Sequence, residues 1–281
     1  MTIFEAYNST KQKLMKAGIE DYVFEAKQII KHITGLNATA ILTNYNRNLT
    51  EFQQNNLTAL LRQREIRYPL QYILGEWDFY GRPFYVGPGV LVPRADTETL
   101  VEAGLDYLKD KQGPKILDLC AGSGCIGITF ACERKDSEVL MVEKFDEAIN
   151  YAERNIHKNN ATNSAIKKGD VFDSVEAEGS YDLIVSNPPY IAESEINEMS
   201  PETQFEPQTA LLAKDDGLEF YKAIANNYKK ALKNGGMLAF EVGFKQSEAV
   251  AEILKLAGFA DIKFKKDLSD INRVVIGIYE F

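Results

Sequence analysis

The sequence contains very few of the residues that bind transition metals or form disulfides. Of its 281 residues, only two are histidine and three are cysteine. Cys120 and Cys125 lie close together and Cys132 lies a little beyond, which is not the spacing of a zinc site. We therefore expect no metal site and no disulfide framework, and a reducing compartment such as the cytoplasm.

Long apolar runs are also absent. No continuous apolar stretch is long enough to span a bilayer, and the opening residues Met-Thr-Ile-Phe-Glu show no signal-peptide pattern. With 45% hydrophobic and 26% charged residues, the chain can bury a sizeable core, and its length predicts two domains, one of them small. The sequence thus predicts a soluble cytoplasmic protein with no membrane partner.

Positive charge is scarce beyond the first quarter of the chain. Residues 1–75 hold nine Lys/Arg and six Asp/Glu, a balance of +3, and the total of −9 leaves −12 for the remainder. A phosphate backbone is bound by clustered cations, so a domain this acidic is poorly suited to it. We expect no direct nucleic-acid binding, although a local basic groove within the negative total stays open as an alternative.

The first 70 residues have helical periodicity and almost no strand signal. Apolar spacing predicts helices from residue 3 to about 17, over 21–33, over a short turn at 38–42, and from the capping-box sequence Thr-Glu-Phe-Gln at 50–53 onwards. Pro69 ends the last one. We interpret residues 1–70 as a small helical bundle. It either stabilises the chain or docks a macromolecule, and this region alone does not decide between the two.

Residues 71–94 have a strand-like pattern in place of the helical one, and they predict a β-hairpin connector. The stretches at 72–75 and 84–86 are β-like, and the Gly-Arg-Pro sequence at 81–83 predicts the turn between them. The sequence Ala-Asp-Thr-Glu at 95–98 then opens a helix, with acidic residues in the first turn as the helix dipole favours. We assign residues 95–281 to a third part, the second domain of the chain.

From Lys115 onwards, strand and helix patterns alternate, which is typical of a parallel α/β sheet. A strand at 115–119 leads into a turn where Gly122 and Gly124 let the backbone approach a ligand closely. A second strand, from residue 138, ends in Glu143, the position of an acid that accepts ribose hydroxyls. The alternative is a tight turn with a surface glutamate. A phosphate-binding loop is excluded because no Gly-Lys-Ser/Thr follows.

Two further strands complete the predicted site. The one at 165–168 leads to Asp170, which could accept a hydrogen bond from an adenine amine, with Phe172 packing beside the ring. The one at 181–185 leads to Asn187. If the strands lie in the order 3-2-1-4-5, the carboxyl ends of all four bring the glycine turn, Glu143, Asp170 and Asn187 to one crevice.

Residues 187–190 read Asn-Pro-Pro-Tyr and form the most informative stretch. Prolines have no N–H for a ladder, so the chain leaves the sheet at Asn187. The Asn187 side-chain oxygen and the Pro188 carbonyl then offer two acceptors for a planar –NH2 group, with the Tyr190 ring as a flat wall. Two such bonds would draw the nitrogen lone pair out of conjugation and direct it at an electrophile. An ordinary Pro-Pro turn with a packed tyrosine is the alternative, and these four residues alone do not decide.

The assembled motifs resemble those of a known family. The Asp-Leu-Cys-Ala-Gly-Ser-Gly sequence at 118–124, Glu143, Gly-Asp at 169–170 and Asn-Pro-Pro-Tyr resemble class I S-adenosylmethionine-dependent methyltransferases that modify amino groups. The closer resemblance is to the release factor N(5)-glutamine methyltransferases, the PrmC/HemK family. It rests on Tyr-Ile-Leu-Gly at 72–75, Leu-Val-Pro-Arg at 91–94, Glu-Pro-Gln-Thr-Ala-Leu at 206–211 and Glu-Val-Gly at 241–243. Cys120 stands where this loop often has a glycine.

This resemblance implies a fold, a reaction and a set of site residues. The fold would be a Rossmann-like class I methyltransferase sheet with the N-terminal helical bundle as a substrate-docking domain. The methyl donor would be S-adenosylmethionine, and the acceptor the glutamine amide in the Gly-Gly-Gln motif of class I peptide chain release factors. The implied cofactor-binding residues are Asp118, Ala121, Gly122, Gly124, Glu143, Asp170, Phe172 and Asn187. The implied catalytic residues are Asn187, Pro188 and Tyr190, and Pro189 joins them in binding the substrate.

Two other functions remain as alternatives. A methyltransferase acting on the exocyclic amine of adenine or cytosine would use the same corner, because it fits any planar –NH2. The acidic catalytic domain and the Leu-Val-Pro-Arg motif argue against that reading. A catalytically idle adaptor is the second alternative, although such a protein has no need to keep Gly122, Glu143 and Asn187 together.

Overall fold

The computed structural model of the chain describes residues 1–173 and 178–280. Contacts divide it into two compact units. Unit 1 comprises Met1–Gly75 and Ser200–Phe205, and unit 2 comprises Glu76–Met199 and Glu206–Phe281. The three-part division at residues 70 and 94 stays a prediction. No helix within the described ranges has the length and apolar character needed to cross a membrane.

Unit 1 is helical, as its periodicity predicts. Its helices are α1 (Ile3–Lys16), α2 (Tyr22–Thr34), α3 (Ala38–Thr43), α4 (Glu51–Glu65) and α5 (Leu70–Leu74). The predicted capping box of α4 is confirmed: the Thr50 hydroxyl accepts from the Gln53 N–H, and the Gln53 side chain accepts from the Thr50 N–H. These bonds satisfy two N–H groups that a helix start would otherwise leave unpaired.

One strand prediction in this region is wrong. Residues 72–75 were expected to be β-like, but Tyr72, Ile73 and Leu74 belong to α5, and Gly75 ends that helix with a φ of 75°. A left-handed residue after a helix is a common C-cap, and glycine adopts it without strain. Leu70, Tyr72 and Ile73 are buried. An apolar run this short has no period that separates a buried strand from a buried helix.

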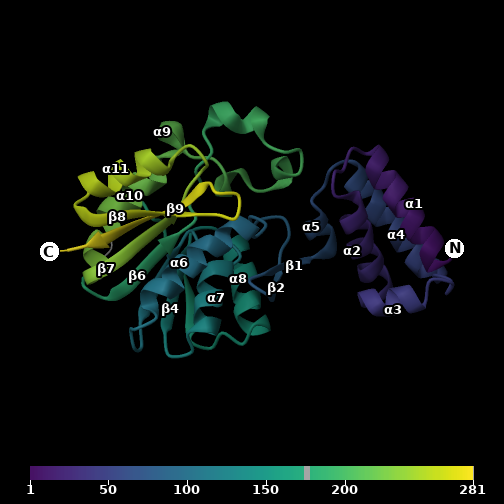
Figure 1. Cartoon of the computed structure of the whole chain (residues 1–281), viewed down its shortest axis with the longest axis horizontal. Helices are drawn as coiled ribbons and strands as arrows, with labels where there is room; N and C mark the ends of the chain where they lie inside the picture. Colours follow the sequence, from purple (N-terminus) through teal and green to yellow (C-terminus); the bar gives the residue numbers. More distant parts are fainter. Residues whose placement is uncertain (174–177, 281) are drawn as a thin grey trace. The chain divides into compact units, whose positions relative to one another are not determined.

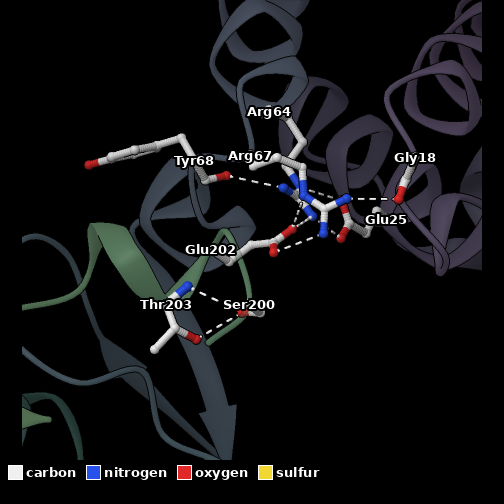
Figure 2. A network of polar contacts seen from close by, with 8 residues as sticks. All are labelled: Gly18, Glu25, Arg64, Arg67, Tyr68, Ser200, Glu202 and Thr203. Atoms are coloured by element: carbon white, nitrogen blue, oxygen red, sulfur yellow. Dashed lines mark hydrogen bonds and ion pairs between the residues drawn. The ribbon is translucent and has the colours of Figure 1, made fainter. Parts of the chain in front are cut away.

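A partly buried ion-pair network holds the short segment Ser200–Phe205 in unit 1 (Figure 2). The Arg64 guanidinium, in a residue only 3% exposed, donates to both oxygens of Glu25 at 2.7 and 2.9 Å, and to Glu202 at 2.8 Å. Arg67 donates to Glu202 at 2.9 Å and to the Gly18 carbonyl at 2.7 Å. Two cations thus balance two anions, which is the condition for burying charge at low cost.

Unit 2 begins with the expected hairpin, in a shifted position. Its strands are β1 (Glu76–Phe79) and β2 (Arg82–Tyr85), paired antiparallel. The turn is Tyr80-Gly81, with φ values of 51° and 69°, so Arg82 and Pro83 lie in the second strand and not in the turn. Positive φ at both central residues is the geometry of a tight two-residue hairpin. Because the pair forms its own two-stranded sheet, Pro83 interrupts no larger ladder.

The remainder of unit 2 is a seven-stranded sheet in the order β5-β4-β3-β6-β7-β9-β8. The strands are β3 (Lys115–Leu119), β4 (Glu138–Glu143), β5 (Ser164–Lys168), β6 (Tyr181–Ser186), β7 (Leu232–Glu241), β8 (Phe259–Lys266) and β9 (Asn272–Tyr279). The first five pair in parallel, and β9 pairs antiparallel to both β7 and β8. The order 3-2-1-4-5, which was the condition for the predicted crevice, is therefore present, and the α/β fold class is confirmed.

Helices cover both faces of this sheet (Figure 1). On one face lie α6 (Glu98–Leu108), α7 (Cys125–Glu133) and α8 (Asp146–Lys158), and on the other α10 (Glu219–Tyr228) and α11 (Ser247–Leu256). Each side has its own apolar core, centred on Phe130 in one and on Tyr221 and Phe240 in the other. Because both faces are covered, the central strands β3 and β6 are almost wholly buried, as parallel strands in such sheets usually are.

Shorter helical turns connect these elements. The turn η1 (Ala95–Thr97) precedes α6, η2 (Glu193–Glu198) and η4 (Gln208–Ala210) lie beyond β6, and α9 (Lys214–Gly217) precedes α10. The turn η3 (Thr203–Phe205) belongs to unit 1, and η5 (Lys229–Ala231) leads into β7.

Candidate active site

A cavity of about 270 Å³ opens at the carboxyl ends of the parallel strands in unit 2. Its walls come from the segments after β3 (residues 120–123), at the end of β4 (143–145), after β5 (169–172) and after β6 (Asn187 and Pro189). Ligands of open α/β sheets bind at this edge, where the strand order reverses. Of the predicted cofactor residues, Ala121, Gly122, Glu143, Asp170, Phe172 and Asn187 line the cavity.

The turn after β3 is left-handed at three positions. Cys120, Gly122 and Gly124 have φ values of 59°, 55° and 79°. A Cβ added to Gly122 would meet no atom within 4 Å, so a ligand can approach its backbone closely. Cys120 adopts a conformation that favours glycine, which is the residue this loop often has there. Gly124 does not line the cavity; a Cβ there would come within 2.9 Å of Ile128, so this glycine serves helix packing.

Asp118 lies beneath this turn and not on the cavity wall. It is fully buried, and one of its carboxylate oxygens accepts from the Gly127 N–H at 2.8 Å. Within the described residues its other oxygen has no hydrogen-bond partner. Burial raises the pKa of Asp118 to about 7, although the Gly127 N–H opposes this shift. Asp118 therefore fixes the first turn of α7, and direct contact with a cofactor stays a prediction.

Glu143 organises two loops of the site at once. Its carboxylate accepts from the Gly122 N–H at 2.9 Å, from the Lys144 N–H at 2.8 Å and from the Phe145 N–H at 3.0 Å. A carboxylate has about four lone-pair positions, so these three bonds leave one, on the oxygen that faces Gly122. A ribose could use that position without disturbing the loops.

We expect Glu143→Ala to weaken S-adenosylmethionine binding by about 2 kcal/mol, roughly 30-fold, because a charged acceptor is lost and the two loops lose their common anchor. Titration calorimetry of the free protein measures this directly. Glu153→Ala is the matched control, since Glu153 is exposed on α8 and does not line the cavity. Unchanged affinity in Glu143→Ala would mean that another acid holds the ribose.

Asp170 and Phe172 lie next along the wall. The Lys144 ammonium contacts Asp170 at 2.7 Å, and the other Asp170 oxygen accepts from the Phe172 N–H at 3.1 Å. Burial pushes the pKa of Asp170 up, but the Lys144 and Phe172 bonds outweigh it and leave that pKa below its usual value. The Phe172 ring meets the Phe220 ring edge-on, with centroids 5.0 Å apart. The result is an ionised acceptor beside an aromatic surface, which suits an adenine and its amine.

Asn187 is half-buried at the end of β6, where its side chain lines the cavity. Its Nδ2 donates to the Thr97 hydroxyl at 3.4 Å, and no described residue donates to its Oδ1. The amide oxygen is thus left as an acceptor toward the cavity. Pro189 also lines the wall, whereas Pro188 and Tyr190 are not among the lining residues.

Tyr190 is held by its surroundings. Its N–H donates to the Leu211 carbonyl at 3.2 Å, and its carbonyl accepts from the Gln246 side chain at 2.9 Å. A Cβ on Gly243 would lie 3.3 Å from its ring, which packs against the core beneath α10 and α11. Burial raises the pKa of Tyr190, so its hydroxyl stays protonated at neutral pH. A role beside the substrate amide stays a prediction for both Pro188 and Tyr190.

Other parts of the wall were missed as site residues. Residues 89–91, Pro93 and Arg94 contribute from the connector. Thr209 and Ala210 contribute from the Glu-Pro-Gln-Thr-Ala-Leu segment, and Leu212 follows directly after it. Buried Glu206 joins the two segments, because it accepts from the Val92 N–H at 2.9 Å and pairs with Arg94. The two motifs carried the family resemblance, but no spacing rule relates segments so far apart in the chain.

Comparison with known proteins places the chain in a family. Residues 5–75 match the PrmC N-terminal domain, and residues 96–251 match the methyltransferase small domain. A release factor glutamine methyltransferase of Thermodesulfovibrio yellowstonii is 38% identical over 255 residues, covering 90% of this chain and 91% of that protein. That of Escherichia coli K12 is 37% identical, covering 91% of each. The chain belongs to the release factor glutamine methyltransferase family.

Solved structures agree on the fold. A methyltransferase from Pyrococcus furiosus gives a TM-score of 0.52 at 18% identity, covering 83% of this chain and all of that one. The hMettl16 catalytic domain, in complex with the MAT2A 3'UTR hairpin 6, gives 0.57 at 18% identity, covering 83% of each chain. As a member of the release factor glutamine methyltransferase family, this chain is a methyltransferase, and its methyl donor is S-adenosylmethionine. The open backbone at Gly122, the spare acceptor on Glu143 and the ionised Asp170 fit that donor.

Proposed function

We propose that this chain transfers a methyl group from S-adenosylmethionine to the side-chain amide nitrogen of the glutamine in the Gly-Gly-Gln motif of class I peptide chain release factors. The observation that carries the proposal is Asn187, whose Nδ2 is bonded to Thr97 and whose Oδ1 is left open at the cavity wall. The family assignment supplies the substrate.

The chemical difficulty is the amide nitrogen, whose lone pair is delocalised into its carbonyl. Asn187 Oδ1 and the Pro188 carbonyl each accept one N–H of the substrate amide, which holds the –NH2 plane and directs its lone pair. Glu143, Asp170, Phe172 and the Gly122 turn hold the cofactor, which supplies an electrophilic methyl group on a sulfonium. The nitrogen–carbon bond forms as the carbon–sulfur bond breaks, and the nitrogen then loses a proton.

Positioning provides most of the acceleration in this scheme, because no general base is needed before the transfer. Ser186 is no nucleophile, since its hydroxyl is buried and bonded to the Leu119 carbonyl at 2.7 Å. We expect the protein to act in the cytoplasm, where release factors work, without binding membranes. We also expect no direct binding of nucleic acid, because the chain beyond residue 75 carries a net charge of −12.

The test is methyl transfer from labelled S-adenosylmethionine by the full-length protein. Three acceptors are compared: an intact class I release factor, the same factor with the motif glutamine changed to alanine, and duplex DNA. We expect label only in the unaltered factor. Labelling of DNA without labelling of the factor would overturn the proposal in favour of an exocyclic-amine methyltransferase.

A further inference from the structure

Two buried polar residues lie beside Asn187 and take no part in the reaction described above, although one of them, Thr97, also lines the cavity. Glu241 is the last residue of β7, and Thr97 is the last residue of η1; each is 2% exposed. In the parallel pairing of β6 with β7, Ser186 is the partner of Phe240. Continuing that register by one residue places Glu241 beside Asn187, on the same face of the sheet.

Thr97 connects these two side chains. Its hydroxyl hydrogen-bonds to the Glu241 carboxylate, and its oxygen accepts from Asn187 Nδ2 at 3.4 Å. A hydroxyl has one proton and two lone pairs, so the acceptor at one end decides what it can do at the other. While an ionised Glu241 takes the Thr97 proton, Thr97 can only accept from the asparagine. The amide NH2 must then face Thr97, and Oδ1 must face the cavity.

We propose that Thr97 and Glu241 are positioning residues that fix the orientation of the Asn187 amide and so keep its oxygen available to the substrate. The inference rests on the function proposed above. If Glu241 carries a proton, it can donate to Thr97. The Thr97 proton is then free to bond Asn187 Oδ1, the amide turns over, and the acceptor for the substrate is lost.

Glu241 is suited to this role because it is held near its ionisation point. Burial raises the pKa of Glu241 to about 7, opposed by the Thr97 hydrogen bond and by the charges of Arg273 and Arg94. One of its oxygens has no hydrogen-bond partner among the described residues. The other titratable groups that interact with Glu241 are Asp96, Cys125, Tyr190 and Tyr221. Since the ionised form is the productive one, turnover should fall as the pH drops through about 7.

The first test compares two substitutions at one position. Thr97→Val keeps the shape and removes the hydroxyl, whereas Thr97→Ser keeps the hydroxyl. We expect Thr97→Val to lower kcat for release factor methylation about tenfold, with KM and cofactor affinity within about twofold of wild type. Thr97→Ser should recover kcat to within about threefold. Equal losses in the two variants, or a wild-type kcat in Thr97→Val, would show that Thr97 only fills space.

The second test separates Glu241 from Asp118, whose pKa also lies near 7. Glutamine keeps an oxygen that can accept the Thr97 proton but does not titrate, so in Glu241→Gln the fall in rate below pH 7 should disappear. If that fall persists in Glu241→Gln, the titrating group is not Glu241 and this part of the inference is wrong.

A third measurement needs no substrate, so it holds whether or not the proposed function does. The side-chain amide resonances of Asn187 in the free protein should shift with pH around 7 in wild type. They should not shift in Thr97→Val or Glu241→Gln. A pH-independent Asn187 amide in wild type would overturn the inference. Failure of the wild-type protein to methylate release factor would overturn only the proposed function.

Discussion

Replacing Asn187 by alanine should lower the single-turnover rate of release factor methylation about 100- to 1,000-fold at saturating cofactor. This is the usual cost of removing one preorganised polar contact from an active site. Cofactor affinity should change little, because Glu143, Asp170 and the Gly122 turn contact the other parts of the cavity. A wild-type rate in Asn187→Ala would show that residues 187–190 form only a turn.

Asn187→Asp gives the second half of this experiment. Aspartate keeps an oxygen acceptor of nearly the same shape, so it should retain more activity than alanine. It should still be slower than wild type for two reasons. Its charge stabilises the ground-state sulfonium, and a second carboxylate now competes with Glu241 for the single proton of Thr97. Activity in Asn187→Asp below that in Asn187→Ala would mean that charge, and not the acceptor, dominates at this position.

The sheet and the crevice could be predicted because each depends on local patterns and on one topological rule. Apolar runs of strand length, a glycine turn and an acid at a strand end are all visible within a few residues. The order β5-β4-β3-β6-β7 then brings the carboxyl ends of these strands together, whichever way the helices pack on the sheet. Helix caps were predictable for the same reason, since Thr50 and Gln53 are three residues apart.

The roles of single side chains were less accessible to sequence reasoning. Asp118 belongs to the glycine-loop motif, yet its carboxylate turns inward to Gly127, because side chains alternate faces along a strand. Glu143 is predicted to accept ribose hydroxyls, and the structure adds that three backbone N–H groups use most of its acceptor positions. Every residue except proline has a backbone N–H, so the sequence does not indicate which of these groups will bond to Glu143. The number of such bonds is known only once the fold is known.

Long-range partners were not predictable at all. In the sequence, Arg64 is one more charged residue in a predicted helix. Its burial between Glu25 and Glu202 depends on Glu202, which lies 138 residues further along the chain. Thr97 likewise reads as part of a helix start, whereas its hydroxyl connects β7 to the end of β6. A single sequence without homologues offers no signal that pairs such distant positions.

Removing Met1–Gly75 should abolish efficient methylation of the intact release factor while leaving the cofactor site in place. Every residue that lines the cavity lies in unit 2, so a chain that begins at Glu76 should bind S-adenosylmethionine with nearly wild-type affinity. Unit 1 differs in character and in charge balance, and we expect it to supply contacts to the protein substrate. Losing two strongly contributing contact residues is enough for a drop of about 100-fold or more in kcat/KM.

The truncated chain requires one correction and one control. It lacks Arg64 and Arg67 and so leaves Glu202 without its cationic partners, and Glu202→Gln in the same chain removes that unpaired charge. A short peptide containing Gly-Gly-Gln is the control acceptor, since it is too small to need a docking domain. If unit 1 docks the release factor, both chains should methylate the peptide at similar rates, and only the intact factor should distinguish them. If both chains methylate the intact factor at the same rate, unit 1 has a purely structural role. If the truncated chain loses as much activity on the peptide as on the intact factor, the truncation has damaged the catalytic unit itself.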